Sequence, residues 1–502
     1  MLSIGFDIGS SSIKACIWDV EKGTVIASAQ HPETEMEIQS PHPGWAEQDP
    51  ELWWKYVVLL TRRLLREKNI RPDQVKAIGI AYQMHGLVVV DATGKLLRPS
   101  IIWCDSRAVE TGDQALAALG ADYCQQHLLN SPGNFTASKL RWVQQHEPEI
   151  YKKVSKAMLP GDYIALKLTG RITTTASGLS EGIFWDYSRA KVDDKLLAYY
   201  QIDPHLLSAL TPTFGNQGVV STAAAEETGL VAGTPVAYRA GDQPNNALSL
   251  NVLNPGELAA TAGTSGVVYA VTESIVTDPA SRVNVFLHVN HADAAPRLGM
   301  LLCINGTGIL NSWLRKNIAS DLTYDGMNRL AASVPVGANG LKCLPFGNGA
   351  ERMLENATVG CHFIDLDFQR HSRADVLRAS QEGIAFSFRY GTDIIRSLGI
   401  PVSILRAGNA NMFKSPLFSS TIATVLGASV ELFETDGAQG AARGGAIGAG
   451  LYASFSEAFA SLSRKATIDP DSNAVNSTAE AYAEWKARLD SLLERRNTVR
   501  TH

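Results

Sequence analysis

Two short turns rich in glycine and hydroxyl groups carry the first chemical signal in this sequence. They are Gly9–Ser12 (GSSS) and Gly263–Gly266 (GTSG), and each joins two strand-like stretches. Such a turn directs several backbone N–H groups and hydroxyls into one concavity, which suits a phosphate. The first turn alone could be a serine-rich hairpin, but its second copy favours a phosphate grip from two sides. Neither turn fits the P-loop pattern G-x-x-x-x-G-K-[ST].

Two aspartates stand at strand ends, where they could serve phosphoryl transfer. Asp7 precedes the first turn, and its charge there is explained if Mg²⁺ lies nearby, because magnesium commonly bridges phosphates to one or two carboxylates, often through water. Asp242, in AGDQ, could orient an alcohol and accept its proton during the transfer. The alternatives are structural: Asp7 can cap a turn, and Asp242 can cap a helix.

A third polar tip, QMHG, follows the apolar stretch Val75–Tyr82. A lone histidine is more often structural, yet His85 beside the apolar Met84 suits a polyol, which presents hydroxyls and C–H surface together. In the segment WCDSR, Asp105 could accept hydrogen bonds from sugar hydroxyls, and Trp103 could supply a flat apolar wall.

Other metal or redox chemistry is not indicated. The six cysteines are widely spaced without a C-x-x-C pair, and we expect them to be reduced thiols. His288 and His291 form an H-x-x-H pair, but no third ligand lies nearby in the sequence, and we predict no zinc site there.

These tips require two similar α/β domains to position them. A chain of 502 residues exceeds what one core usually organises, and the two turns, at positions 9 and 263, are one domain length apart. We place the boundary within 245–253 and predict the domains 1–247 and 248–502. A helix from Pro50, with Asp49 as N-cap, should pack on the first sheet, and Val75–Tyr82 is typical of a strand buried on both faces.

Composition excludes several function classes. The chain is 45% hydrophobic and 19% charged, and its 45 Lys and Arg are dispersed among 50 Asp and Glu, which leaves no basic stripe for nucleic acid. No apolar run reaches the ~20 residues of a membrane span, and the N-terminus lacks a signal-peptide pattern. We expect a cytoplasmic protein that acts on a small molecule, without nucleic acid or membrane partners. The small-residue segment 437–455 favours close helix packing over ligand contact.

The motifs resemble the FGGY family of carbohydrate kinases over nearly the whole chain. The resemblance rests on DIGSSSIK, GWAEQDPELWW, QMHG, KLLRPSIIWCDSR, KLRWVQQHEPEIY, LPGDYIALKLTG, AGDQ, AGTSG, RASQEGIAFSFRYG and RAGNANMF, in this order. It implies two actin-like (ribonuclease H-like) α/β domains with an interdomain catalytic cleft, where the first domain holds mainly sugar and the second mainly ATP. The sequence is most similar to the xylulose kinase branch, which implies Mg-ATP-dependent phosphorylation of D-xylulose to D-xylulose 5-phosphate.

The resemblance also implies roles for individual residues. Asp242 matches the catalytic base, and Asp7, through water, and Asp242 are the expected contacts of Mg²⁺. The expected sugar contacts are Gln83, Met84, His85, Trp103, Asp105, Asp242 and Gln243. The expected ATP contacts are Gly9, Ser10, Ser11, Gly263, Thr264, Gly408 and Asn409, the last two near adenosine.

Several segments depart from the family pattern and affect specificity more than reaction type. Many xylulose kinases read GGGDN where this chain has AGDQP, and Gln243 resembles the glycerol kinase branch. RAGNANMF replaces the commoner GGGARS, NGAERML replaces SGERTP, and TTASG replaces TD-x-S-D. QMHG nevertheless favours a xylulose kinase, because glycerol kinases carry an Arg-Glu pair there. Ribulose, sedoheptulose and glycerol stay alternative substrates.

Two other classes of function stay open. An actin-like ATPase would hydrolyse ATP without a sugar, but QMHG and the absence of a dedicated peptide-binding domain argue against it. A silent sugar-binding regulator would have little chemical need for Asp7 and Asp242. Sugar and ATP are the expected partners, and a homodimer is a common state for soluble enzymes of this size.

Overall fold

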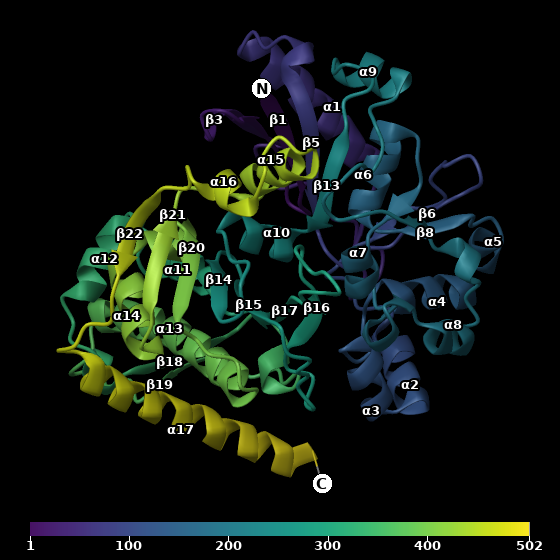
Figure 1. Cartoon of the computed structure of the whole chain (residues 1–502). Coiled ribbons are helices and arrows are strands. Elements are labelled where there is room, and N and C mark those ends of the chain that lie inside the picture. The colour runs from purple at the N-terminus through teal and green to yellow at the C-terminus, as the bar shows by residue number, and fades with distance from the viewer. Residues whose placement is uncertain (501–502) are drawn as a thin grey trace. The chain divides into compact units, whose positions relative to one another are not determined.

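The computed structural model describes the backbone of residues 1–500 and the side chains of residues 1–495, as two compact units (Figure 1). The first unit comprises 1–251, 285–298 and 435–462, and the second comprises 252–284, 299–434 and the chain from 463 onward. These units differ from a simple division into 1–247 and 248–502, because two later segments return to the first unit. The functional meaning of that sequence division stays a prediction.

The main sheet of the first unit has the strand order β13-β5-β1-β2-β3. β1 (Leu2–Ile8), β2 (Ile13–Asp19) and β3 (Thr24–His31) form an antiparallel meander. β5 (Val75–Tyr82) and β13 (Val236–Gly241) run parallel to β1. The carboxyl ends of β1, β5 and β13 therefore meet at one edge, as parallel strands require.

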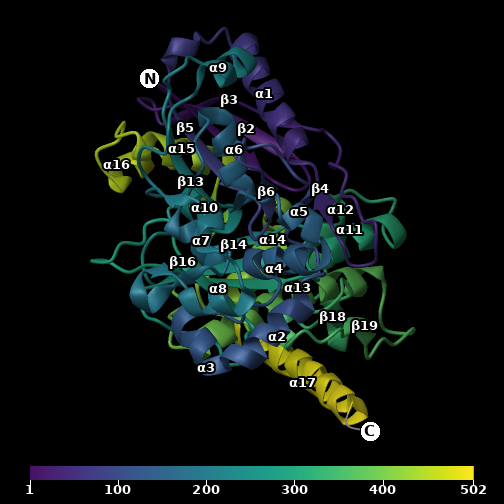
Figure 2. The ribbon, with the colours of Figure 1, turned by 90° about the vertical axis from the view of Figure 1, so that its right-hand side faces the viewer.

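Different helices cover the two faces of this sheet, because side chains alternate along a strand. Ile4 and Phe6 of β1 share one core with α1 (Pro50–Glu67) and α6 (Pro160–Thr169). The opposite face carries α15 (Gly437–Gly448), and Figure 2 shows α1 and α15 on opposite sides of the strands. β5 is thus buried on both faces, as predicted.

Glycine makes the contact between α15 and the sheet possible. A Cβ on Gly5 would lie 2.1 Å from the carbonyl oxygen of Ala438, and one on Gly79 would lie 1.9 Å from that of Ala441. From the helix side, a Cβ on Gly445 would lie 2.7 Å from the backbone nitrogen of Gly79. The prediction that this small-residue segment packs closely is confirmed.

Other helices and short sheets complete the first unit. α1 begins as predicted, since Asp49 is its N-cap and accepts a hydrogen bond from the backbone of Glu51 at 2.9 Å. The further helices are α2 (Val109–Leu119), α3 (Ala121–Tyr123), α4 (Thr136–His146), α5 (Pro148–Tyr151), α7 (Ala176–Glu181), α8 (Asp194–Tyr200), α9 (Thr222–Thr228), α10 (Asp242–Ser249) and α16 (Phe455–Phe459). The short pairs are β4 (Glu47–Gln48) with β7 (Ser100–Ile101), β6 (Val88–Val90) with β8 (Lys156–Met158), β9 (Thr173–Thr174) with β12 (Ala209–Leu210), and β10 (Trp185–Asp186) with β11 (Lys191–Val192). β16 (Asn284–Leu287) belongs mostly to this unit.

The second unit repeats the strand scheme of the first. Its sheet has the order β17-β15-β14-β20-β21-β22. The second hydroxyl-rich turn joins antiparallel β14 (Glu257–Ala262) and β15 (Gly266–Thr272), and β20 (Ile404–Gly408) and β21 (Ser429–Phe433) run parallel to β14. The internal repeat predicted from the two turns is therefore present in the topology.

The remaining elements of the second unit are as follows. The strands are β17 (Leu298–Ile304), β22 (Arg464–Ile468) and the pair β18 (Lys342–Phe346) with β19 (Gly360–Ile364). The helices are α11 (Gly308–Asn317), α12 (Tyr324–Ala332), α13 (Arg373–Ser397), α14 (Pro416–Leu426) and α17 (Val475–Arg500). Of the helices within 1–500, none combines the length and hydrophobicity that crossing a membrane requires.

The contact between α15 and the sheet predicts a sharp effect of one methyl group. Gly79→Ala should lower the free energy of unfolding of the first unit by about 3 kcal/mol, because the methyl meets backbone rather than a movable side chain. The measurement is urea denaturation followed by circular dichroism.

Gly326→Ala, on α12, is the matched control. A Cβ there would make only ordinary contacts, the nearest at 3.5 Å, so the variant should be neutral or more stable by up to about 1 kcal/mol. Equal unfolding midpoints for the two variants would contradict the packing described above.

Candidate active site

The carboxyl ends of three neighbouring strands bring the predicted residues of the first unit to one edge. In the strand register, Ile8 pairs with Tyr82, and Tyr82 pairs with Gly241. Neighbouring strands are about 4.8 Å apart. The first turn, the QMHG tip and Asp242 therefore leave the sheet side by side.

Asp242 is the first residue of α10 and is partly exposed. Burial raises its pKa to about 7, and the negative charge of Asp7 adds to this rise, whereas hydrogen bonds from the backbone and side chain of Gln243 oppose it. A carboxyl that titrates near neutral pH can accept a proton from an alcohol and release it again. Gln243, which is predicted to contact sugar, thus donates hydrogen bonds to the carboxylate of Asp242.

Asp7 lies between charges of both signs. Burial raises its pKa to about 6; Lys14, its partner across the β1–β2 ladder, opposes this rise, and Asp436 adds to it. Asp436 is the N-cap of α15 and accepts a hydrogen bond from the backbone of Gln439 at 2.9 Å. Sequence reasoning missed Asp436, although an Asp just before a helix of small residues is a recognisable N-cap signal.

Carboxylates thus gather around the first turn, and their mutual repulsion fits a bound cation. A Cβ on Gly437 would lie 2.3 Å from Oδ2 of Asp7, so α15 begins directly against that carboxylate. Within the part of the chain that the structure describes, no three His, Cys, Asp or Glu side chains form a group that could hold a metal by themselves. The donor set suits Mg²⁺, which keeps several waters and takes only one or two carboxylates besides phosphates.

The first turn is held through its carbonyl groups. Nε2 of Gln48 donates to the carbonyl of Ser10 at 2.7 Å, and the backbone nitrogen of Met36 donates to the carbonyl of Ser11 at 2.7 Å. A turn fixed on its carbonyl side offers N–H groups and hydroxyls on the other side. This is the polarity that a phosphate requires.

Two predicted sugar residues also support this turn. Nε2 of the buried Gln83 donates to Oε1 of Gln48 at 3.2 Å, behind the bond from Gln48 to Ser10. Nε1 of Trp103 donates to Oγ of Ser10 at 3.3 Å, while half of the Trp103 surface stays exposed (50%). Trp103 therefore presents an open indole face beside the turn, as a flat sugar wall would require.

The second unit assembles its own predicted residues in the same way. The carbonyl of Gly263 accepts from the backbone of Gly308 at 2.8 Å, and that of Thr264 accepts from Ile309 at 3.1 Å, both at the start of α11. A Cβ on Gly308 would lie 2.2 Å from the oxygen of Gly263. The second turn is thus also held by its carbonyls.

The loop predicted to lie near adenosine leaves the same edge of the second sheet. Ala260 pairs with Ala407, and Gly408 ends β20. Nδ2 of Asn409 donates to Oε1 of Glu434 at 2.6 Å. The structure therefore brings Gly408 and Asn409 together with the second turn, while their nucleotide contacts stay a prediction.

His85 has an unusual backbone, and Glu181 contacts both its backbone and its ring. Its φ is +60°, in the left-handed region that costs a non-glycine residue free energy. The backbone nitrogen of His85 donates to Oε2 of Glu181 at 3.1 Å, and its Nδ1 lies 2.9 Å from the carbonyl oxygen of Glu181. Because a carbonyl only accepts, Nδ1 carries the proton, and Nε2 is the acceptor nitrogen of the neutral ring.

The His85 tip is further fixed by packing and by a buried lysine. Its ring lies edge-on to Phe135, with centroids 4.8 Å apart, and tilted against Phe286 at 5.3 Å. Nζ of the buried Lys139 donates to the carbonyls of His85 at 2.8 Å and of Ile102 at 3.0 Å. Burial lowers the pKa of Lys139 to about 7. Lys139 thereby joins the QMHG tip to the segment that carries Trp103.

Glu181 is the second residue that sequence reasoning missed. Burial raises its pKa well above the usual range, which favours the neutral form and limits repulsion with Asp242. Met84 is also buried (4% exposed), and a Cβ on Gly241 would lie 2.6 Å from its Cγ. Nothing in the local sequence ties Glu181 to His85, since the contact is long-range.

Asp105 occupies a different environment from the one that a sugar contact suggests. The residue is fully buried; Oδ2 accepts from the backbone of Ala46 at 2.6 Å and from the guanidinium of Arg107 at 2.6 Å. That guanidinium lies 3.8 Å from the ring centroid of Trp45. The carboxylate of Asp105 organises its own loop, and a direct sugar contact for it stays a prediction.

Comparisons with known proteins cover nearly all of the chain. The model of the N-terminal domain of the FGGY family of carbohydrate kinases matches residues 2–249, and that of the C-terminal domain matches residues 258–453. The xylulose kinase of Escherichia coli (strain K12) is 29% identical over 97% of both chains. The xylulose kinase of Staphylococcus epidermidis (strain ATCC 12228) is 31% identical over 79% of this chain and 77% of its own. The solved structure of xylulose kinase from Rhodospirillum rubrum superposes with a TM-score of 0.87 at 27% identity, covering 98% of this chain and 99% of that one.

The titration of Asp242 predicts a pH-dependent gain of stability in Asp242→Asn. Because the pKa of this carboxyl is about 7 in the folded protein against an ordinary 3.8, the folded state binds more protons between these values, and stability falls as pH rises through this window. Asparagine removes that cost. We expect the variant to exceed the parent protein by on the order of 2–4 kcal/mol at pH 8 and to equal it at pH 4.

The measurement is thermal or urea unfolding at both pH values, with Asp91→Asn as control. Asp91 lies in an exposed turn, where hydrogen bonds from Thr93 lower its pKa, so its replacement should bring no gain at pH 8. An equal gain for Asp242→Asn at pH 4 and pH 8 would contradict the assigned cause.

Proposed function

The chain belongs to the FGGY family of carbohydrate kinases, and we propose that it transfers the γ-phosphate of ATP to D-xylulose, forming D-xylulose 5-phosphate. Its fold is the two-domain, actin-like α/β arrangement that the sequence predicted. The observation that carries the proposal is the edge where Asp242, with its near-neutral pKa, lies beside the QMHG tip and the first turn. The names of the relatives support the choice of sugar.

Asp242 takes the role of general base in this proposal. Its carboxylate orients the acceptor hydroxyl and takes its proton as the oxygen attacks phosphorus. Hydrogen bonds from Gln243 keep the carboxylate oriented. Nε2 of His85 accepts a hydrogen bond from a second sugar hydroxyl, because Nδ1 is engaged by Glu181.

The two hydroxyl-rich turns take the phosphates of ATP. Gly9, Ser10 and Ser11 do so in the first unit, and Gly263 and Thr264 in the second; each turn is held by its carbonyls and directs its donors outward. Mg²⁺ would be held by Asp7 and Asp242, with Asp436 nearby, and would supply neutralisation of the phosphate charge. In this scheme residues 1–247 bind mainly the sugar and residues 248–502 bind mainly ATP, with the first turn contributing to the phosphates.

A substrate panel tests the proposal. ADP release with Mg-ATP is measured against D-xylulose, D-ribulose, sedoheptulose and glycerol, and we expect D-xylulose to exceed the others well. Asp242→Ala should reduce turnover by about 10²–10⁴-fold, the contribution of a general base, while ATP binding by calorimetry stays unchanged. A flat panel with sugar-independent ATP hydrolysis would overturn the kinase assignment in favour of an actin-like ATPase.

Glu181 provides a second test, because it positions His85 rather than reacting. Glu181→Ala should raise the KM for the sugar by about tenfold, the equivalent of one lost hydrogen bond, with the KM for ATP unchanged. Glu181→Gln keeps an acceptor for the backbone N–H of His85. Its KM for the sugar should therefore lie between those of the parent protein and Glu181→Ala. Glu149→Ala, at a side chain that is 79% exposed, is the control; an unchanged sugar KM in Glu181→Ala would contradict the positioning role.

A further inference from the structure

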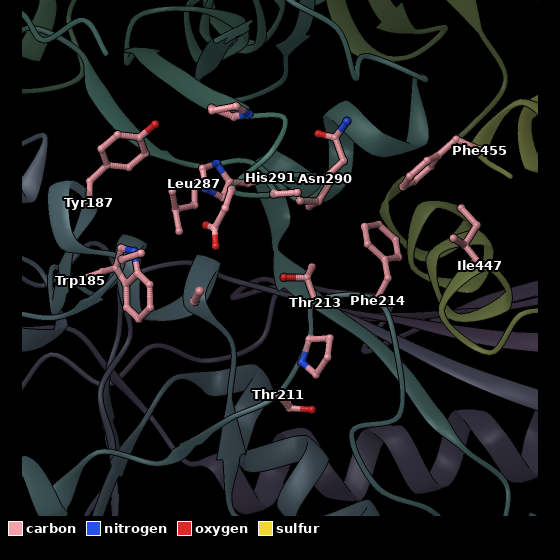
Figure 3. Close-up of a pocket in the computed structure, with 17 residues that line it drawn as sticks. Trp185, Tyr187, Thr211, Thr213, Phe214, Leu287, Asn290, His291, Ile447 and Phe455 are labelled. Atoms are coloured by element: carbon pink, nitrogen blue, oxygen red, sulfur yellow. The ribbon is translucent and has the colours of Figure 1, made fainter. Parts of the chain in front are cut away.

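One cavity of the first unit is lined by none of the residues assigned to the reaction (Figure 3). Its volume is about 640 Å³, within the range of small-molecule pockets. Separated parts of the chain line it: Ala176 at the start of α7, the region of β10, the loop 211–214, the end of β16 with the turn that follows it, Ile447 of α15 and Phe455 of α16. Segments that are distant in the sequence thus converge on this cavity.

The cavity and the proposed sugar tip lie on opposite faces of β16. Phe286 packs against the ring of His85, with centroids 5.3 Å apart, whereas Leu287 and Val289 line the cavity. Alternate residues of an extended segment point to opposite sides. The cavity is therefore distinct from the sugar tip, although β16 and α7, whose first residue Ala176 lines the cavity, contribute to both.

Aromatic side chains form two facing walls. Figure 3 shows Trp185 and Tyr187 on one side and Phe214 and Phe455 on the other. Phe214 is fixed from behind, since it stacks on Tyr238 at a centroid distance of 4.9 Å and meets Phe455 edge-on at 5.3 Å. Walls that are already packed need little reorganisation to receive a ring.

Polar groups lie between the walls, and the described lining offers an anion no positive charge. Thr213, Asn290 and His291 lie between the two aromatic walls (Figure 3). Burial lowers the pKa of His291, so this imidazole is neutral at physiological pH. Among the described lining residues no Lys or Arg occurs, and Asp293 adds a carboxylate. A phosphate group would find no positive partner here.

We propose that this cavity binds a neutral, hydroxylated ring compound, with its apolar face against the aromatic walls and its hydroxyls bonded to Thr213, Asn290 and Asp293. Glycosides and nucleosides share this chemistry, and both fit a cavity of about 640 Å³. Phosphorylated sugars and nucleotides do not share this chemistry, because they carry a phosphate group. The ligand of this cavity is one that the phosphoryl transfer does not require. The proposal is therefore independent of the sugar assignment.

Calorimetric titration of the full chain tests this with two probes, methyl β-D-xylopyranoside and adenosine. Ala292→Trp fills the cavity from an exposed lining position, and Ala294→Trp, exposed in the same turn but outside the lining, is the matched control. We expect one probe to bind the parent protein and Ala294→Trp, and to lose that binding in Ala292→Trp. The probe that binds identifies the source of the ligand.

Two outcomes would overturn the proposal: no binding of either probe up to its solubility, or equal binding by Ala292→Trp and Ala294→Trp, which would place the ligand elsewhere. Unfolding curves establish that both variants fold. Phe455→Ala removes part of one aromatic wall and should weaken binding of the same probe. Phe368→Ala, at a side chain that is 92% exposed, should leave that binding unchanged. Unchanged binding in Phe455→Ala would likewise reject the site.

Discussion

The close contact between α15 and the first sheet is the constraint on which the site depends. Gly5 and Gly79 on the strands and Gly445 on the helix allow backbone to touch backbone, at distances that any side chain would prevent. The same helix binds α10 from its other side, since Nδ2 of Asn245 donates to the carbonyl of Gly437 at 2.9 Å. One helix therefore fixes both the strand that contains Asp7 and the helix that begins at Asp242.

This packing has an electrostatic consequence at the end of α15. The helix begins at Asp436 and Gly437, beside the carboxylate of Asp7, and the charges of Asp7 and Asp436 raise the pKa values of their neighbours. Bringing several carboxylates together costs stability unless a proton or a cation compensates. A positive charge at this site is therefore stabilising, and this is where the proposed reaction needs Mg²⁺ and a proton acceptor.

The sequence was sufficient for features that are local or repeated. The two turns, the strand buried on both faces and the cap at Asp49 each follow from a few adjacent residues, and the duplicated turn predicted the duplicated topology. Local sequence can mark Asp436 as an N-cap, but it could not reveal the effect of Asp436 on Asp7 or that of Glu181 on His85, because both arise across long stretches of chain. Asp105 shows the reverse case: its segment resembles a sugar-binding motif, but only the structure reveals that Arg107 and the backbone of Ala46 occupy its carboxylate.

The departure of this chain from its family at TTASG has a structural meaning of its own. Thr175 in that segment is the N-cap of α7, with Oγ1 accepting from the backbone of Gly178 at 3.0 Å. α7 is a short helix whose last residue is Glu181. The altered segment therefore starts the helix that ends at Glu181, and Glu181 contacts both the backbone N–H and the ring of His85, whose backbone is left-handed. A segment distant in sequence from QMHG thus takes part in orienting the histidine of QMHG, through the helix that ends at Glu181.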